Sequence, residues 1–251
     1  MIANETYLIS YLGGTCGFFI KQLIIRILHN RNDPILGENG NAHESNLLYY
    51  ENIKVDSEYH NLTLQNTWEK SILEFVTPHR SIHPMIVSDH CSPNWEYMFE
   101  NFPNSKNIII QCNISNLEHI LGNMFFKVNI LRPNIWARFK NNFAPTIENP
   151  EELTPGIIET FIKTSAMLGR DQAYLKYPFK EGDTIPEIYK DRILVITFDQ
   201  ILNDPNLIMD KLSTFIGKDL PTNLPNLYQI YLDRQKELID TKMPWLNTLP
   251  K

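Results

Sequence analysis

A glycine-rich stretch near the N-terminus has the residue types of a loop that binds phosphate or sulfate. An apolar run over residues 7–12 leads into it, and apolar residues then recur with helical spacing at Phe19, Leu23 and Ile27. A strand, a glycine loop and a helix in this order gather backbone N–H groups at the positive end of a helix dipole. We therefore predict an anion-binding loop, although a tight turn that needs glycine only for its backbone freedom has the same composition. The predicted anion-binding residues are Gly13, Gly14, Thr15, Cys16, Gly17 and Phe18.

His90 is the side chain best suited to acid–base chemistry. It ends an apolar run at residues 84–90, which is typical of a buried strand. An imidazole with a pKa near ~6.5 can accept a proton from a hydroxyl group at neutral pH. Asp89 precedes it, but successive side chains of a strand point to opposite faces, so Asp89 is not expected to orient His90. The alternative is a structural histidine that hydrogen-bonds a neighbouring loop.

Other polar residues have weaker chemical signals. A helix N-terminus lowers the pKa of a thiol, so a Cys16–His90 nucleophile pair is one interpretation, and a small residue that fits the loop is the simpler one. Asn113, which follows a third apolar run, and Asn123 and Lys127 on the next helix are predicted to face the ligand, with a solvated helix face as the alternative. The remaining histidines lack the spacing of a metal site, and no metal is predicted. They include His43, His79 and His83.

The segments that position these residues alternate between strands and helices. Strands are expected at residues 7–12, 84–90, 107–112 and 193–198, and helices from Phe18 and at residues 66–75, 95–102, 117–127, 206–216 and 224–239. This alternation predicts an α/β fold with three layers, a parallel sheet with helices on both faces. Ligands of such sheets bind beyond the carboxyl ends of the strands, so the loop, His90 and residues 113–116 are predicted to converge on one crevice. Ser115 or Asn116 is expected to cap the helix that follows.

Length and composition fit one intracellular globular domain. The chain has 251 residues, 43% of them hydrophobic, which is enough for a substantial core. A net charge of −6 argues against a general nucleic-acid-binding protein. Three cysteines without a CxxC motif, no signal-peptide pattern and no apolar run of ~20 residues favour a cytoplasmic location without membrane contact. We expect a single domain over residues 1–251, with a loop-rich insertion at about 30–80 and a helical segment at about 131–190, while the oligomeric state is not specified.

The glycine loop differs from the common nucleotide-binding motifs. It lacks the GxxxxGK[ST] pattern, because no lysine follows the glycines and no Ser or Thr is placed to hold Mg²⁺. It also lacks the GxGxxG pattern of dinucleotide-binding proteins. These differences disfavour triphosphate hydrolysis and dinucleotide binding, and they leave a loop suited to a single phosphate or sulfate group.

Three segments resemble the P-loop sulfotransferases, a family that uses 3′-phosphoadenosine 5′-phosphosulfate. Residues 10–17 (SYLGGTCG) resemble the family's 5′-phosphosulfate loop, whose usual form is Pro-Lys-Ser-Gly-Thr-Thr/Ser. Residues 88–93 (SDHCSP) resemble its Lys-Thr-His-Leu-Pro segment, with His90 on the histidine that acts as general base. Residues 193–217 (ILVITFDQILNDPNLIMDKLSTFIG) closely resemble its late strand, its Tyr-Glu-Asp-Leu segment, its Asp-Pro and the following helix.

The resemblance implies a P-loop sulfotransferase-like fold and a corresponding activity. That activity is transfer of a sulfuryl group from 3′-phosphoadenosine 5′-phosphosulfate to a hydroxyl of a small molecule or carbohydrate, without a metal. In this comparison Gly14 and Thr15 hold the 5′-phosphosulfate, and His90 deprotonates the acceptor. Asn113 and Asn123 fall where the family binds the 3′-phosphate.

The sequence departs from the family at charged positions. Leu12 stands at the family's loop lysine, residues 112–114 (CNI) stand at its Arg-Asn-Pro motif, and its late Arg-Lys-Gly motif has no match. Another cation, Lys127, Arg132 or Lys21, would then meet the 3′-phosphate. Two alternatives follow, a non-catalytic protein that binds a nucleotide or sulfate on the same fold, and a phosphoryl or nucleotide transferase.

Overall fold

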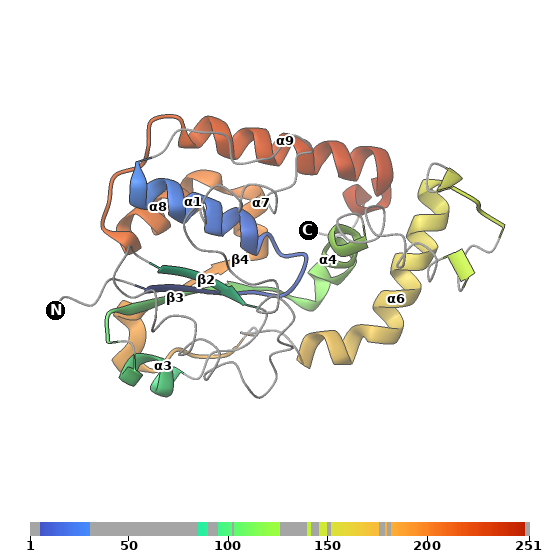
Figure 1. The fold of residues 1–251 in the computed structure, drawn as a ribbon. Helices are drawn as coiled ribbons and strands as arrows, with labels where there is room; N and C mark the ends of the chain where they lie inside the picture. The colour runs from blue at the N-terminus through green and yellow to red at the C-terminus, as the bar shows by residue number, and fades with distance from the viewer. Residues whose placement is uncertain are drawn as a thin grey trace.

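The described part of the chain contains one parallel sheet of four strands. The structure is a computed structural model and describes residues 6–30, 85–89, 95–101, 103–125, 140–141, 146–149, 152–175, 179 and 182–248. The strands are β1 (Thr6–Ser10), β2 (Met85–Asp89), β3 (Ser105–Gln111) and β4 (Ile193–Thr197). Their order is β2-β1-β3-β4, and each neighbouring pair is parallel (Figure 1). The predicted α/β class and all four predicted strands are confirmed.

Burial on both faces of the sheet explains the apolar runs in the sequence. Successive side chains of β3 point to opposite faces. Ile108 and Ile110 join the core cluster that contains α1 residues, whereas Ile109 packs with Leu8 and Phe99. A strand buried in this way has a nearly continuous apolar sequence, as is typical of parallel sheets.

Three long helices lie on one side of the sheet, and a short one lies on the other (Figure 1). The long helices are α1 (Gly17–His29), α8 (Pro205–Ile216) and α9 (Leu224–Lys242), and the short one is α3 (Trp95–Asn101). The predicted apolar stripe of α1, Phe19, Leu23 and Ile27, is buried in the main core with Leu212 and Tyr228. The helix predicted from Phe18 is therefore confirmed, and its apolar stripe faces the core.

Capping side chains mark the starts of the two helices that follow β4. Thr197 Oγ1 accepts the N–H of Gln200 at 3.1 Å, and the N–H of Thr197 donates back to the Gln200 side chain, so α7 (Phe198–Asn203) begins with a capping box. Asp204 accepts the N–H of Leu207 at 3.1 Å at the start of α8, which ends at Gly217 with φ 76°. The helix predicted at residues 206–216 is confirmed as α8. Helix α7 was not predicted, although a threonine followed three residues later by glutamine is its signature.

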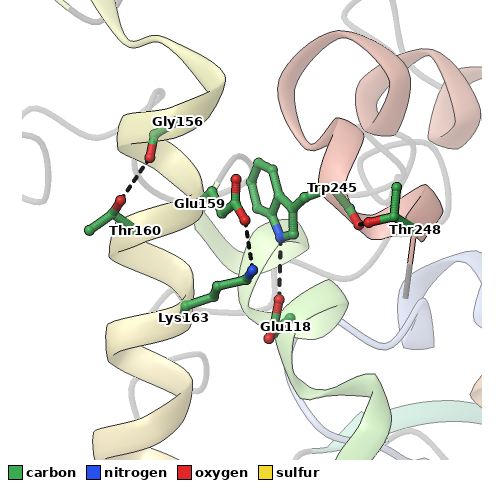
Figure 2. A network of polar contacts seen from close by, with 7 residues as sticks. All are labelled: Glu118, Gly156, Glu159, Thr160, Lys163, Trp245 and Thr248. Carbon is green, nitrogen blue, oxygen red and sulfur yellow. Dashed lines mark hydrogen bonds and ion pairs between the residues drawn. The ribbon is translucent and has the colours of Figure 1, made fainter. Parts of the chain in front are cut away.

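A second, smaller core surrounds α4 (Leu117–Met124). This helix packs against α6 (Pro155–Leu175) and lies beside the 3₁₀ helix Pro244–Thr248. A Cβ on Gly122 would lie 2.1 Å from the sulfur of Met243, so the C-terminal segment touches the backbone of α4. Trp245 Nε1 donates to the carboxylate of Glu118 at 3.2 Å, and Figure 2 shows this bond beside α6. Elements from both sides therefore fix α4.

The start of α4 differs from the sequence prediction. Asn116 stands at the N-cap position, but its side chain makes no capping bond to α4. It accepts the N–H of Asn113 at 2.9 Å and donates to Asp199 at 2.9 Å instead. The cause is a 3₁₀ turn, Ile114–Asn116, that precedes the helix and uses the asparagine side chain to close itself. The predicted side-chain cap is therefore corrected.

Several predicted segments lie outside the described residues. These are the helix near residues 66–75, most of the insertion at 30–80, and the end of the helix predicted over 117–127. Helix α6 is the longest described element of the predicted helical segment at 131–190. Among the described helices, none is both long enough and apolar enough to cross a membrane.

Candidate functional site

The strand order reverses at β1, and this places the candidate site. From β1 the chain reaches β2 on one side and then crosses to β3 on the other side. In open parallel sheets, ligands bind beyond the carboxyl ends of the strands at such a switch point. The loop after β1 and the turn after β3 therefore share one edge of the sheet, as predicted. His90 lies outside the described residues, which end for β2 at Asp89, the partner of Ser10 in β1.

The first half of the loop is a tight turn closed by Thr15. The carbonyl of Leu12 accepts the N–H of Thr15 at 3.1 Å, and it also accepts the Thr15 hydroxyl at 2.6 Å. Gly14, the third residue of this turn, has φ 89°, the conformation that a type II turn requires there. Thr15 is fully buried. In this conformation Thr15 shapes the loop, and its two donors point at Leu12 and not toward a ligand.

The second half of the loop delivers the N-terminus of α1. Cys16 is the N-cap residue, with φ 66° and ψ 16°, and its side chain makes no capping hydrogen bond to the helix. The N–H groups of a first helical turn have no acceptor within the helix, and the helix dipole is positive there. No acidic residue lies in this first turn. A left-handed conformation costs a residue with a side chain about 1–2 kcal/mol, and such strain clusters at ligand sites.

Asn123 connects the loop to α4. Its Nδ2 donates to the carbonyl of Gly14 at 3.1 Å, and the residue is fully buried. A Cβ on Gly14 would lie 2.6 Å from the carbonyl oxygen of Ile120 and 2.9 Å from Cγ of Met124. The loop backbone therefore lies directly on α4. The structure brings together two predicted site residues, Gly14 and Asn123, through a contact to each other.

Gly17 is needed by the protein's own packing. A Cβ at this position would lie 2.2 Å from ring carbons of Tyr11, which is itself buried. The ring of Phe18 meets Tyr11 edge-on, with the centroids 6.1 Å apart. This contact lets α1 begin immediately beside the end of β1.

The two described cysteines, Cys16 and Cys112, are buried. Cys16 Sγ accepts the hydroxyl of Tyr231 at 2.9 Å. Burial raises the pKa of the Cys112 thiol, and the neighbouring Cys16 raises it further, although a hydrogen bond with Thr15 opposes them. Burial also raises the pKa of Tyr231 well above its usual value. Cys16 is 3% exposed and is covered by Tyr231, and this burial favours a packing role for Cys16 over a nucleophile pair with His90.

The turn after β3 offers amides and no cation. Asn113 is partly exposed and is bonded through its N–H to Asn116, and residues 111–125 contain no lysine or arginine. The described turn after β3 therefore supplies no cation to a ligand at this edge of the sheet. Lys21 is buried on α1, with its Nζ 5.7 Å from the ring centroid of Phe18. The other proposed cations lie outside the described residues; they are Lys127 and Arg132.

Leu12 and the histidines complete the list of predicted positions. Leu12, which stands at the family's lysine, is partly buried and packs against the main core. The three histidines considered for a metal lie outside the described residues; they are His43, His79 and His83. Within the described ranges, no group of three or more His, Cys, Asp or Glu residues is arranged to hold a metal ion.

Sequence reasoning missed Tyr231 as a neighbour of the loop. Its contact to Cys16 joins residues 215 positions apart, and no local pattern signals it.

A scan against protein-family models and a search of curated proteins both found no match to this chain. The functional argument therefore depends on the geometry of the loop and its surroundings.

Proposed function

We propose that this chain binds the 5′-phosphosulfate end of 3′-phosphoadenosine 5′-phosphosulfate at the loop after β1 and transfers the sulfuryl group to a hydroxyl acceptor. The proposal includes a three-layer fold of the P-loop sulfotransferase type. Its main support is the start of α1, where a strained, left-handed Cys16 opens the helix N-terminus at the switch point of the sheet, without a capping bond from its own side chain. Backbone N–H groups at a helix N-terminus bind phosphate and sulfate through hydrogen bonds and the dipole.

Each group then has a defined part in the proposed reaction. The donor supplies a sulfur atom activated as a mixed anhydride with phosphate. His90 takes the proton of the acceptor hydroxyl, whose oxygen forms a new S–O bond, and the S–O bond to the phosphate breaks on the opposite side. Donors at the start of α1 stabilise the negative charge that gathers on the leaving phosphate. Adenosine 3′,5′-bisphosphate and the sulfate ester are the products, so atoms and charge balance.

Removal of the proposed base tests the reaction. His90→Ala should lower sulfuryl transfer, measured with radiolabelled donor, by roughly 10²–10⁴-fold, while adenosine 3′,5′-bisphosphate still raises the melting temperature of the variant. Asn104→Ala, at an exposed turn before β3, is the control and should keep full activity. Unchanged turnover in His90→Ala would refute the proposed role of His90.

A second candidate is a protein on the same fold that binds a nucleotide or sulfate without turnover. Leu12 in place of a lysine, and the commitment of both Thr15 donors to Leu12, favour this candidate. It predicts stabilisation by the bisphosphate and no transfer to any hydroxyl acceptor. A phosphoryl transferase would instead be stabilised by ATP with Mg²⁺, so a thermal-shift screen with both nucleotides and free sulfate separates the three.

A further inference from the structure

We propose that Asn123 is a positioning residue that holds the loop after β1 in its anion-binding shape. This inference rests on the proposed function of that loop. Asn123 lies on α4, more than a hundred residues along the chain from Gly14, and its Nδ2 donates to the Gly14 carbonyl at 3.1 Å. Helix α4 is itself packed against α6 and against the C-terminal segment at Met243 and Trp245. The Asn123 bond therefore joins the loop to a helix that other elements hold in place.

The peptide between Gly14 and Thr15 is held at both polar ends. Asn123 binds its carbonyl oxygen, and the carbonyl of Leu12 binds its N–H at 3.1 Å. The plane of this peptide sets the direction in which the chain continues into Cys16 and the first turn of α1. A site fixed before its ligand arrives loses less entropy on binding, which raises affinity.

Packing alone does not account for an asparagine at this position. The residue is fully buried, and its Oδ1 has no hydrogen-bond partner among the described residues. A buried acceptor without a partner is unfavourable. An apolar side chain would avoid this cost but would leave the partly buried Gly14 carbonyl without this donor. The amide is thus explained by the one bond that it makes, the bond to the loop.

The backbone of Gly14 lies in close contact with α4. A Cβ on Gly14 would already lie 2.6 Å from the carbonyl of Ile120. If the Asn123 bond is removed, we expect the loop to move away from α4 and Cys16 to move with it. Cys16 is 3% exposed in the structure, so its reactivity reports this movement.

The test compares Asn123→Asp with Asn123→Ala in the full chain. Both remove the donor to Gly14, and the aspartate also places an acceptor against the Gly14 carbonyl. Titration calorimetry with adenosine 3′,5′-bisphosphate should show affinity reduced by roughly five-fold or more, up to the ~150-fold that a fully buried acceptor without its donor would cost. Alkylation of Cys16, resolved from the other cysteines by peptide mass spectrometry, should become at least about tenfold faster in both variants, the equivalent of about 1.4 kcal/mol.

A structural control separates positioning from general destabilisation. Ile158→Ala removes a buried side chain from the α4–α6 core without touching the loop. It should lower the melting temperature while affinity and Cys16 labelling stay within about twofold of the wild type, a change of under 1 kcal/mol. Equal loss of affinity in this control would overturn the inference, because the Asn123 effect would then be ordinary loss of stability.

The remaining outcomes distinguish the inference from the proposed function. If the wild type binds the bisphosphate and both Asn123 variants bind it within about twofold, under 1 kcal/mol, the positioning role is wrong and the function stands. If the wild type binds neither the bisphosphate nor inorganic sulfate or phosphate, the proposed function is wrong and the inference falls with it.

Discussion

Gly14 offers a quantitative test of whether the loop lies against α4. Its φ is 89°, and a left-handed conformation costs an L-residue about 1–2 kcal/mol. A Cβ there would also lie 2.6 Å from the carbonyl oxygen of Ile120 and 2.9 Å from Cγ of Met124, and an atom forced into a packed contact costs about 1–3 kcal/mol. Gly14→Ala should therefore lower the free energy of unfolding by about 2–5 kcal/mol. Urea denaturation measures this loss, with an unchanged slope showing that the unfolded state is the same.

Gly217→Ala is the matched control for the backbone conformation. Gly217 has φ 76°, but a Cβ there would meet nothing within 4 Å. This variant carries only the conformational cost of about 1–2 kcal/mol. The difference between the two variants, about 1–3 kcal/mol, isolates the contact with α4. Equal losses would refute the argument, because they would mean that no atom of α4 crowds Gly14.

Two further predictions concern stability. Burial raises the pKa of Cys112, Tyr228 and Tyr231 in the folded state, so the folded chain keeps protons that the unfolded chain has lost. Their contribution to the free energy of unfolding is complete below about pH 9. Above that pH the contribution of the thiol falls, and above about pH 10 that of each phenol falls, by up to ~1.4 kcal/mol per pH unit for each group. Urea midpoints that stay constant across this range would contradict the burial of these groups. Asp204→Ala removes the acceptor for the N–H of Leu207 at the start of α8 and should cost about 1 kcal/mol, seen as a lower melting temperature; an unchanged value would show that the cap contributes nothing.

The fold was predictable where local signals coincide with tertiary contacts. The isoleucines of β3 form an uninterrupted apolar run because both of its faces are buried, and Asp204 and Gly217 mark the ends of α8 in the sequence itself. The side-chain role of Asn116 was not predictable, because it depends on a 3₁₀ turn and on Asp199 from another part of the chain. Capping rules apply to a helix that follows a non-helical residue, whereas α4 follows a 3₁₀ turn.

The placement of the loop after β1 beside the turn after β3 was predictable, and the contacts of the loop were less so. The order of strands and helices placed the loop and the turn after β3 at one edge, and Asn123 was expected to face the same crevice. The partner of Asn123 is a backbone carbonyl, which has no sequence signature. The orientation of Thr15 was also hidden, because a threonine after two glycines is compatible with a ligand contact and with the turn closure that the structure contains.

The glycines of the loop do not by themselves argue for a ligand. Gly14 is needed because a side chain there would clash with α4, and Gly17 is needed because a side chain there would clash with the ring of Tyr11. Cys16 is different, because its left-handed backbone would favour glycine, yet a cysteine is present and its sulfur accepts the Tyr231 hydroxyl. The main core therefore holds this strained residue in place, and the strain of about 1–2 kcal/mol is offset by buried contacts. The strained residue lets α1 begin abruptly at the switch point of the sheet, and under the proposed function this helix N-terminus is the feature that binds the anion.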